Sequence, residues 1–149
     1  MNRAKLDALI KGHEGLELNV YKDTVGVLTV GYGHALHPGS GITRAAADAL
    51  YEGDICVVAA DYDRLVKDGA IPPGLSEVRQ AVLMDMLFNL GRAKFLKFKN
   101  FLVALKLGDF PGAVRHMKAS LWARQVGRRA ERLTDMMETG RWPKDIGDE

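Results

Sequence analysis

The sequence has a single cysteine, Cys56, so it forms no intramolecular disulfide, and nothing in it requires an oxidising compartment. Cys56 lies in the apolar stretch 55–58, where we expect a small core side chain. The chain also lacks an uncharged run close to the roughly 18 to 20 apolar residues that cross a membrane. The start of the chain carries charged side chains where a signal peptide would be apolar: Arg3, Lys5, Asp7, Lys11 and Glu14. We therefore expect a soluble protein made in the cytoplasm without a signal peptide.

Internal repeats and low-complexity tracts are absent as well. Hydrophobic residues make up 47% and charged residues 27% of the chain, which is the balance of an ordinary globular protein. This composition excludes a disordered or collagen-like chain. A length of 149 residues is enough for one domain, or for two small lobes that share an element, and we expect a single domain over residues 1–149.

The charges are unevenly distributed, although the net charge is only +2. Residues 92–132 carry 11 Lys and Arg and two acidic residues, a net charge of +9, whereas the rest of the chain has a net charge of −7. Clustered cations raise the local concentration of anions, so this basic segment indicates a polyanionic partner, either nucleic acid or anionic cell wall. The alternative is a solvated helix face without a partner.

The first half of the chain combines a helix, a small sheet and a long helix. Residues 3–13 have apolar side chains at helical spacing, and Gly15 follows as a stop. Residues 16–36 are rich in β-formers interrupted by turn residues, which predicts a short antiparallel hairpin or a three-stranded sheet. Thr43 then caps a long helix that runs to about Lys67.

The second half is helical in pattern, with no further strand signal. Ser76 or its neighbour begins an apolar helix that Gly91 ends. Further helices are predicted at residues 100–107, 111–119 and 128–139. The fold class is therefore α+β and predominantly helical, with an N-terminal lobe at about residues 14–50, a connecting helix at about 43–67 and a C-terminal lobe at about 74–142. We expect a cleft at such a junction.

Two carboxylates, Glu14 and Asp23, end the first helix and occupy the first turn of the predicted sheet. Glycoside hydrolysis needs such a pair: a protonated acid donates to the leaving oxygen, and an ionised carboxylate activates water or stabilises the transition state. Glu14 follows an apolar helix face and suits the acid, whereas Asp23 lies in a polar turn and suits the ionised partner. The alternative is two ordinary surface acids, because the chain has 19 Asp and Glu.

Several segments carry a family resemblance. The first are residues 13–16 (HEGL), 21–24 (YKDT) and 28–34 (LTVGYGH), and residues 88–91 (FNLG), 120–129 (SLWARQVGRR) and 139–142 (TGRW) follow in order. Together they resemble the phage-type lysozymes, or endolysins, of glycoside hydrolase family 24. The resemblance covers nearly the whole chain, and it implies a lysozyme-like fold in which the first helix packs on the C-terminal lobe.

Carried over by position, the resemblance assigns the general acid to Glu14, the second carboxylate to Asp23, and the hydroxyl beside the catalytic water to Thr29. It implies an N-acetylmuramidase that hydrolyses the β-1,4 bond between N-acetylmuramic acid and N-acetylglucosamine in peptidoglycan, with no cofactor. No metal site is expected either, because His34 and His37 lack a second cluster that would complete four ligands. Lytic transglycosylase chemistry stays open, because an acid at Glu14 serves both reactions. A non-catalytic module that binds cell wall or nucleic acid also stays open, although no single recognition helix supports nucleic acid.

The same segments supply candidates for substrate binding. Gly permits backbone to approach a sugar, Phe offers an apolar platform and Asn a hydrogen bond to an N-acetyl group; the candidates are Gly31, Tyr32, Phe88, Asn89, Gln125 and Arg129. Arg129 matches the arginine that the family places near the catalytic Glu, and its alternative is a surface arginine. Trp122 is a similar candidate. Core packing is the alternative for both Phe88 and Trp122, and we favour it for Trp122.

The resemblance also implies a biological setting. It implies a monomer encoded by a phage or prophage, stored in the host cytoplasm and released to the cell wall through a holin-type pore, with the basic segment attracted to anionic wall polymers. The chain departs from the best-known members in the short connection between His34 and Thr43, which predicts that a small helix of longer relatives is missing. Val25 also replaces an acid that some relatives have.

Overall fold

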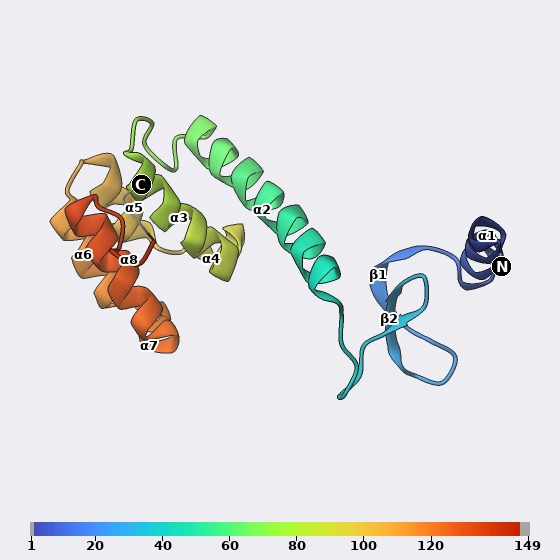
Figure 1. Ribbon diagram of the computed structural model, residues 1–149. Coiled ribbons are helices and arrows are strands. Elements are labelled where there is room, and N and C mark those ends of the chain that lie inside the picture. The colour runs from blue at the N-terminus through green and yellow to red at the C-terminus, as the bar shows by residue number, and fades with distance from the viewer. Residues whose placement is uncertain (1, 147–149) are drawn as a thin grey trace. The chain divides into compact units, whose positions relative to one another are not determined.

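The computed structural model describes residues 2–146, which form eight helices and one three-stranded antiparallel sheet (Figure 1). The chain divides into two compact units, Met1–Asp48 (unit 1) and Ala49–Glu149 (unit 2). This content of helix and sheet confirms the predicted α+β class with a predominance of helix. Within the described residues, no helix has the length and apolar character needed to cross a membrane.

Unit 1 begins with helix α1, Arg3–Glu14. The side chain of Asn2 caps its start by accepting a hydrogen bond from the backbone N–H of Lys5 at 3.1 Å. At its end, Gly15 has a φ of 69° and donates its N–H to the carbonyl of Lys11 at 3.0 Å. The predicted helix and its glycine stop are therefore confirmed, and the stop leaves Glu14 as the last helical residue.

The sheet of unit 1 has the order β1-β2-β3, with bounds Glu17–Lys22, Leu28–Gly31 and His34–Ala35. The register pairs Thr29 in the central strand with Tyr21 on one side and Ala35 on the other. No helix lies between residues 35 and 44 in the described chain, as the short connection predicts. The predicted three-stranded sheet is confirmed.

Helix α2, Arg44–Lys67, is the long predicted helix. The hydroxyl of Thr43 caps it by accepting from the N–H of Ala46 at 3.2 Å. Val58 and Leu65, two turns apart, are its buried side chains. The prediction for Cys56 was wrong: its side chain is exposed, because two residues along a helix turn it well away from the face that Val58 presents to the core.

Six further helices complete unit 2; their bounds are α3 Glu77–Leu90, α4 Arg92–Phe95, α5 Lys99–Lys106, α6 Phe110–Lys118, α7 Leu121–Val126 and α8 Arg128–Thr139. The four longer ones match the predicted helices, and Ser76 caps α3 as expected. Helices α4 and α7 were not predicted as separate elements. With 4 and 6 residues, they are too short to display a helical period in the sequence.

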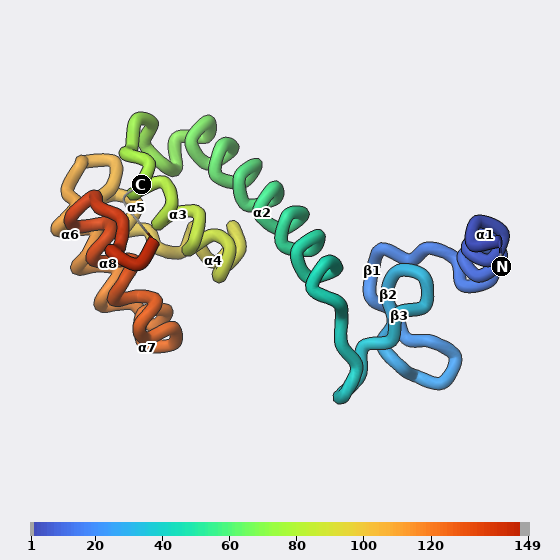
Figure 2. Tube along the Cα trace, in the orientation of Figure 1, coloured from blue at the N-terminus to red at the C-terminus, as the bar shows by residue number. Residues whose placement is uncertain are grey.

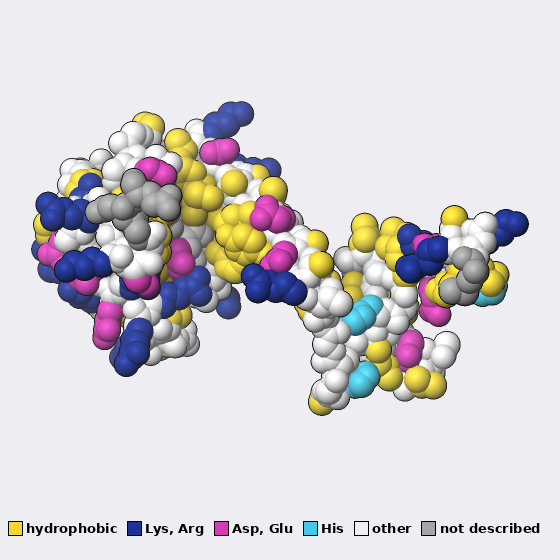
Figure 3. Space-filling view, in the orientation of Figure 1, with side chains coloured by type: hydrophobic (Ala, Val, Ile, Leu, Met, Phe, Trp, Pro, Cys, Tyr) yellow, Lys and Arg dark blue, Asp and Glu magenta, His cyan; other side chains and the backbone are white. Residues whose placement is uncertain are grey.

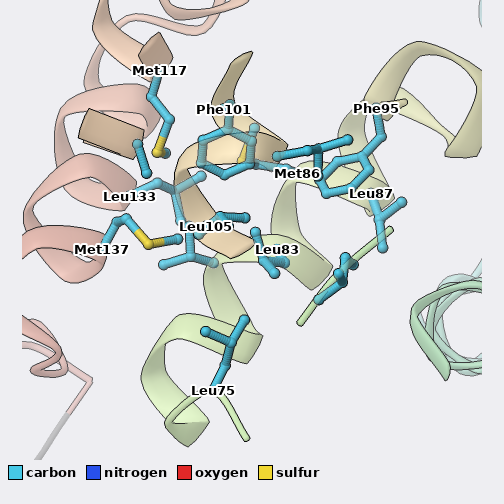
Figure 4. Close-up of a cluster of buried hydrophobic side chains, with 14 of the residues drawn as sticks. Leu75, Leu83, Met86, Leu87, Phe95, Phe101, Leu105, Met117, Leu133 and Met137 are labelled. Carbon is cyan, nitrogen blue, oxygen red and sulfur yellow. The ribbon is translucent and has the colours of Figure 1, made fainter. Parts of the chain in front are cut away.

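The apolar core of the molecule lies in unit 2 (Figures 2 and 4). Helix α6 packs against both α5 and α8, and α8 also packs on α3, as the tube in Figure 2 shows. Figure 4 shows how their side chains interlock, and the largest fully buried apolar ones are Phe95, Phe101, Ile71, Leu83, Met86, Leu105, Met117, Met137 and Val82. The core is therefore built mainly by residues after Val58.

Arg79 ties α3 to the end of α8. Its Nε donates to the carbonyl of Met137 at 2.9 Å and its Nη2 to the carbonyl of Glu138 at 3.3 Å. The guanidinium also stacks 3.6 Å from the ring centre of Phe110. One side chain thus satisfies carbonyls that the helix end leaves without partners.

Candidate active site

Glu14 extends from the end of α1 over the turn between β2 and β3. Its carboxylate lies so close to Gly33 that a Cβ added to that glycine would stand 2.5 Å from Oε2. Gly33 also has a φ of 75°, in the region that favours glycine. Both observations explain why the LTVGYGH segment has glycine at this position: a side chain there would displace the carboxylate.

Asp23 is fixed in the turn between β1 and β2. Its Oδ1 accepts hydrogen bonds from the backbone N–H of Val25 at 2.9 Å and from that of Val27 at 2.8 Å. Its own N–H donates to the carbonyl of Val27 at 2.8 Å. One carboxylate oxygen is therefore used to build the turn, and Oδ2 has no hydrogen bond within the described residues.

Thr29 is buried in the middle strand, with 4% of its surface exposed. Its Oγ1 donates to the carbonyl of Val27 at 3.0 Å, the same carbonyl that accepts from the N–H of Asp23. Since the hydroxyl proton is used, the lone pairs of Oγ1 remain as acceptors. Val27 thus couples the two predicted catalytic side chains, Asp23 and Thr29, through its own backbone.

Gly31 and Tyr32 follow Thr29 at the end of β2. Gly31 has a φ of 69° and would accept a Cβ without any contact, so its glycine serves the backbone turn. The ring of Tyr32 is exposed and lies 5.1 Å from the Nζ of Lys11. Five of the predicted site residues therefore lie in unit 1, on α1, the sheet and its turns: Glu14, Asp23, Thr29, Gly31 and Tyr32.

Phe88 and Asn89 lie at the end of α3 in unit 2. The ring of Phe88 is 41% exposed and its centre lies 6.0 Å from that of Tyr51, so it is not a core residue. The Oδ1 of Asn89 accepts from the Nε1 of Trp122 at 3.0 Å. Trp122 is buried, as predicted, and its bond to Asn89 leaves the amide Nδ2 of Asn89 as a donor.

Arg129, on α8, is paired with Asp85 on α3. Its Nε donates to Oδ1 of Asp85 at 2.7 Å and its Nη2 to the Asp85 carbonyl at 3.4 Å. Both side chains line a cavity of about 390 Å³ together with Phe88 and Tyr51. The sequence analysis did not identify Asp85. An acidic residue within an apolar helix is nevertheless a signal, because a carboxylate among apolar residues usually has a cationic partner.

Gln125, on α7, lines a different cavity of unit 2. This cavity has a volume of about 710 Å³, and Lys94, Lys97 and Lys99 also line it. Sequence reasoning counted these lysines in the basic segment without grouping them. The structure thus separates Gln125 from the cavity that Arg129 and Phe88 share.

The family model for phage lysozyme matches residues 11–138. The chain belongs to the phage lysozyme family. The matched range contains Glu14, Asp23 and Thr29 and runs through almost all of α8, so it confirms the resemblance found in the sequence.

Individual relatives of this phage lysozyme family member differ in length. The pre-baseplate central spike protein Gp5 of Enterobacteria phage T4 is 31% identical over 89% of the chain, but the chain spans only 27% of that protein. Probable T4-type lysozyme 1 of Dictyostelium discoideum is 27% identical, over 89% of the chain and 92% of the relative. A SAR-endolysin of Bacteriophage PS119 is 30% identical, over 87% of the chain and 75% of the relative.

Proposed function

We propose that the chain is a glycosidase that lyses peptidoglycan by hydrolysing the β-1,4 bond between N-acetylmuramic acid and N-acetylglucosamine. The observation that carries this proposal is the arrangement in unit 1. There, Glu14 is seated against a glycine turn, and Asp23 and Thr29 share hydrogen bonds with one carbonyl. Membership of the phage lysozyme family supports the same reaction class.

Glu14 acts as the general acid in this mechanism. Its carboxyl lies on the surface of unit 1 and makes no hydrogen bond within the described residues, so no described protein group occupies the position that a substrate oxygen would take. Protonation of the glycosidic oxygen as the C–O bond breaks releases the leaving sugar as an alcohol. The attacking water gives its proton to Asp23, and a proton returns to Glu14 through solvent before the next turnover.

Asp23 and Thr29 act on the water. Oδ2 of Asp23 and the lone pairs of Thr29 Oγ1 are both acceptors, and Val27 holds both side chains. A water molecule that donates one hydrogen to each would have its own lone pair directed at the anomeric carbon. Asp23 would then stabilise the positive charge that develops on the sugar and accept the proton of the water.

The candidate substrate contacts differ in kind. Nδ2 of Asn89, oriented by the bond between its Oδ1 and Trp122, suits the carbonyl of an N-acetyl group. The exposed rings of Phe88 and Tyr32 suit the apolar face of a sugar. Gly31, Gln125 and Arg129 remain predictions, the last as a residue that Asp85 orients.

The test compares Glu14→Gln with a matched control, Glu17→Gln, which removes an exposed carboxylate three residues away on β1. We expect Glu14→Gln to lower the release of fragments from purified peptidoglycan by about 1,000-fold, because only the proton is lost, and Glu17→Gln to leave it unchanged. Mass spectrometry of the fragments should find hydrated reducing muramic ends. Fragments with 1,6-anhydro ends would replace the proposal with lytic transglycosylase, and no release by wild type would favour a binding module.

The second carboxylate has its own test. Asp23→Asn should keep a hydrogen-bond acceptor for the turn but lose the negative charge, so we expect strongly reduced hydrolysis with some residual activity. Unchanged activity would show that no water is activated by Asp23. A single domain, a monomeric state, attraction to anionic cell wall and storage in the host cytoplasm until holin-dependent release remain predictions.

A further inference from the structure

Arginine and lysine behave differently in the basic segment, residues 92–132. Four of its arginines form ion pairs, and the pairs are Arg92–Asp61, Arg115–Asp109, Arg129–Asp85 and Arg132–Asp145. Within the described part of the chain, none of its lysines does; they are Lys94, Lys97, Lys99, Lys106 and Lys118. Figure 3 shows dark-blue Lys and Arg side chains as separate groups on the visible face of unit 2, with magenta Asp and Glu side chains between some of them. The positive charge left uncompensated by the fold is therefore carried largely by lysine.

Three of these lysines line one cavity, called here the lysine cavity. Its volume is about 710 Å³, and it receives Lys94 from α4, Lys97 from the following turn and Lys99 from the start of α5. His116 of α6 adds a fourth basic group, and no Asp or Glu is among the residues that line it. Three ammonium groups around one cavity suit an anionic ligand.

The rest of the lysine cavity is lined by apolar side chains and by the polar Asn100, Ser120 and Gln125. The rings of Phe98 and Trp122 meet edge-on with centres 6.2 Å apart, and Phe101 packs on Phe98 in the same way at 6.3 Å. Leu121 belongs to the lining too and is 61% exposed. The cavity thus combines cationic side chains with an exposed apolar side chain, Leu121, as a binding site for an amphiphilic anion does.

We propose that the lysine cavity binds the phosphate headgroup of an anionic phospholipid and holds unit 2 at a membrane surface. Lysine is a compact point charge that suits phosphate, and Leu121 offers an apolar contact for the acyl region. A neutral glycan leaves the lysines without a partner. A single-stranded nucleic acid would need exposed aromatic faces for stacking, but Phe101 and Trp122 are 1% and 3% exposed.

The experiment measures sedimentation of the full chain with vesicles of phosphatidylcholine alone or mixed equally with phosphatidylglycerol. Lys94→Gln/Lys97→Gln is compared with Lys106→Gln/Lys118→Gln, which removes the same charge from the same segment outside this cavity. Each lysine at an anionic surface contributes about fivefold to binding, so the first pair should lose on the order of 30-fold. The control pair should lose less than about threefold, and binding should weaken as salt rises.

Other outcomes would overturn the proposal. Equal losses in the two variants would mean a non-specific effect of net charge, and equal binding to both vesicle types would mean that phosphate charge plays no part. Retention on lipopolysaccharide or on soluble muropeptides, without binding to the vesicles, would assign the cavity to those ligands instead. Glu14→Gln should bind vesicles as wild type does, so failure of the proposed hydrolysis and failure of the membrane site are separately visible.

Discussion

The two units differ in how their structure is held. Every buried apolar side chain of the described chain belongs to unit 2, whereas the described part of unit 1 has a single buried side chain, Thr29. Unit 1 is instead defined by local hydrogen bonds: the cap at Asn2, the turn around Asp23 and the strand pairs. The side chains that stabilise the fold by packing and the predicted catalytic side chains therefore lie in different parts of this chain.

This division has a physical basis. Burial of apolar surface supplies most of the stability of a fold, so unit 2 is where substitutions should change the free energy of unfolding. Short hydrogen-bonded turns contribute less, but they fix the direction of a carboxylate or hydroxyl to within a narrow range. Regions of low local stability also supply functional loops in many proteins. The comparison therefore predicts that stability and activity respond to different substitutions.

The largest effect on stability is expected in the core of unit 2. Leu83 is fully buried on α3, and Leu83→Ala removes its packing and leaves a cavity, at a cost of about 2 to 5 kcal/mol. Thermal unfolding should show Tm lowered by roughly 6 to 15 °C. Leu18→Ala, which truncates a leucine of β1 that is 80% exposed, should change Tm by less than about 2 °C. Comparable losses in the two variants would contradict the division between the units.

The next largest effect is expected on hydrolysis, from a substitution in unit 1. Gly33→Ala places a Cβ where the carboxylate of Glu14 lies, so we expect that carboxylate to move and hydrolysis to fall by about 100-fold. Gly39→Ala is the matched control, because Gly39 also has a positive φ, 89°, but a Cβ there meets nothing. Both variants should lose a similar 1 to 2 kcal/mol from backbone strain. Equal activity in the two variants would mean that Gly33 does not determine where the carboxylate of Glu14 lies.

Local signals in the sequence predicted most of the fold. Caps such as Thr43 and Ser76 and the stop at Gly91 bound their helices as expected, because a cap depends on residues close in sequence. The assignment of Cys56 to the core was wrong, since a run of apolar residues does not say which of them faces inward.

The candidate site was predictable where its residues lie close in sequence. The turn of Asp23 and the position of Thr29 follow from one short segment and from the family resemblance. Asp85 and the lysine cavity depend on contacts between helices far apart in the chain; Asp85 and Arg129 stand 44 residues apart. A periodic pattern indicates that such helices pack but does not specify which polar groups meet.

The smallest effect is a pH dependence in unit 2. Burial against the core, and then the negative charge of Asp63, raise the pKa of Tyr62 above its ordinary value of 10.0. Because the neutral phenol is the form that the fold favours, its contribution to stability is complete below about pH 10 and is lost as the pH rises through the raised pKa. Tyr62→Phe should therefore flatten the decline of Tm above pH 10 relative to wild type.

Asp63→Asn provides the matched variant for this titration. It keeps the phenol and removes the second cause of the shift, so the alkaline decline of Tm should lie between those of wild type and Tyr62→Phe. Because Tyr62 is only partly buried, solvent screens the charge and the difference should be no more than a few degrees. Parallel curves for all three proteins would mean that the segment of α2 around Tyr62 unfolds locally before Tyr62 ionises. The burial of Tyr62 would then not contribute to the stability of unit 2 at high pH.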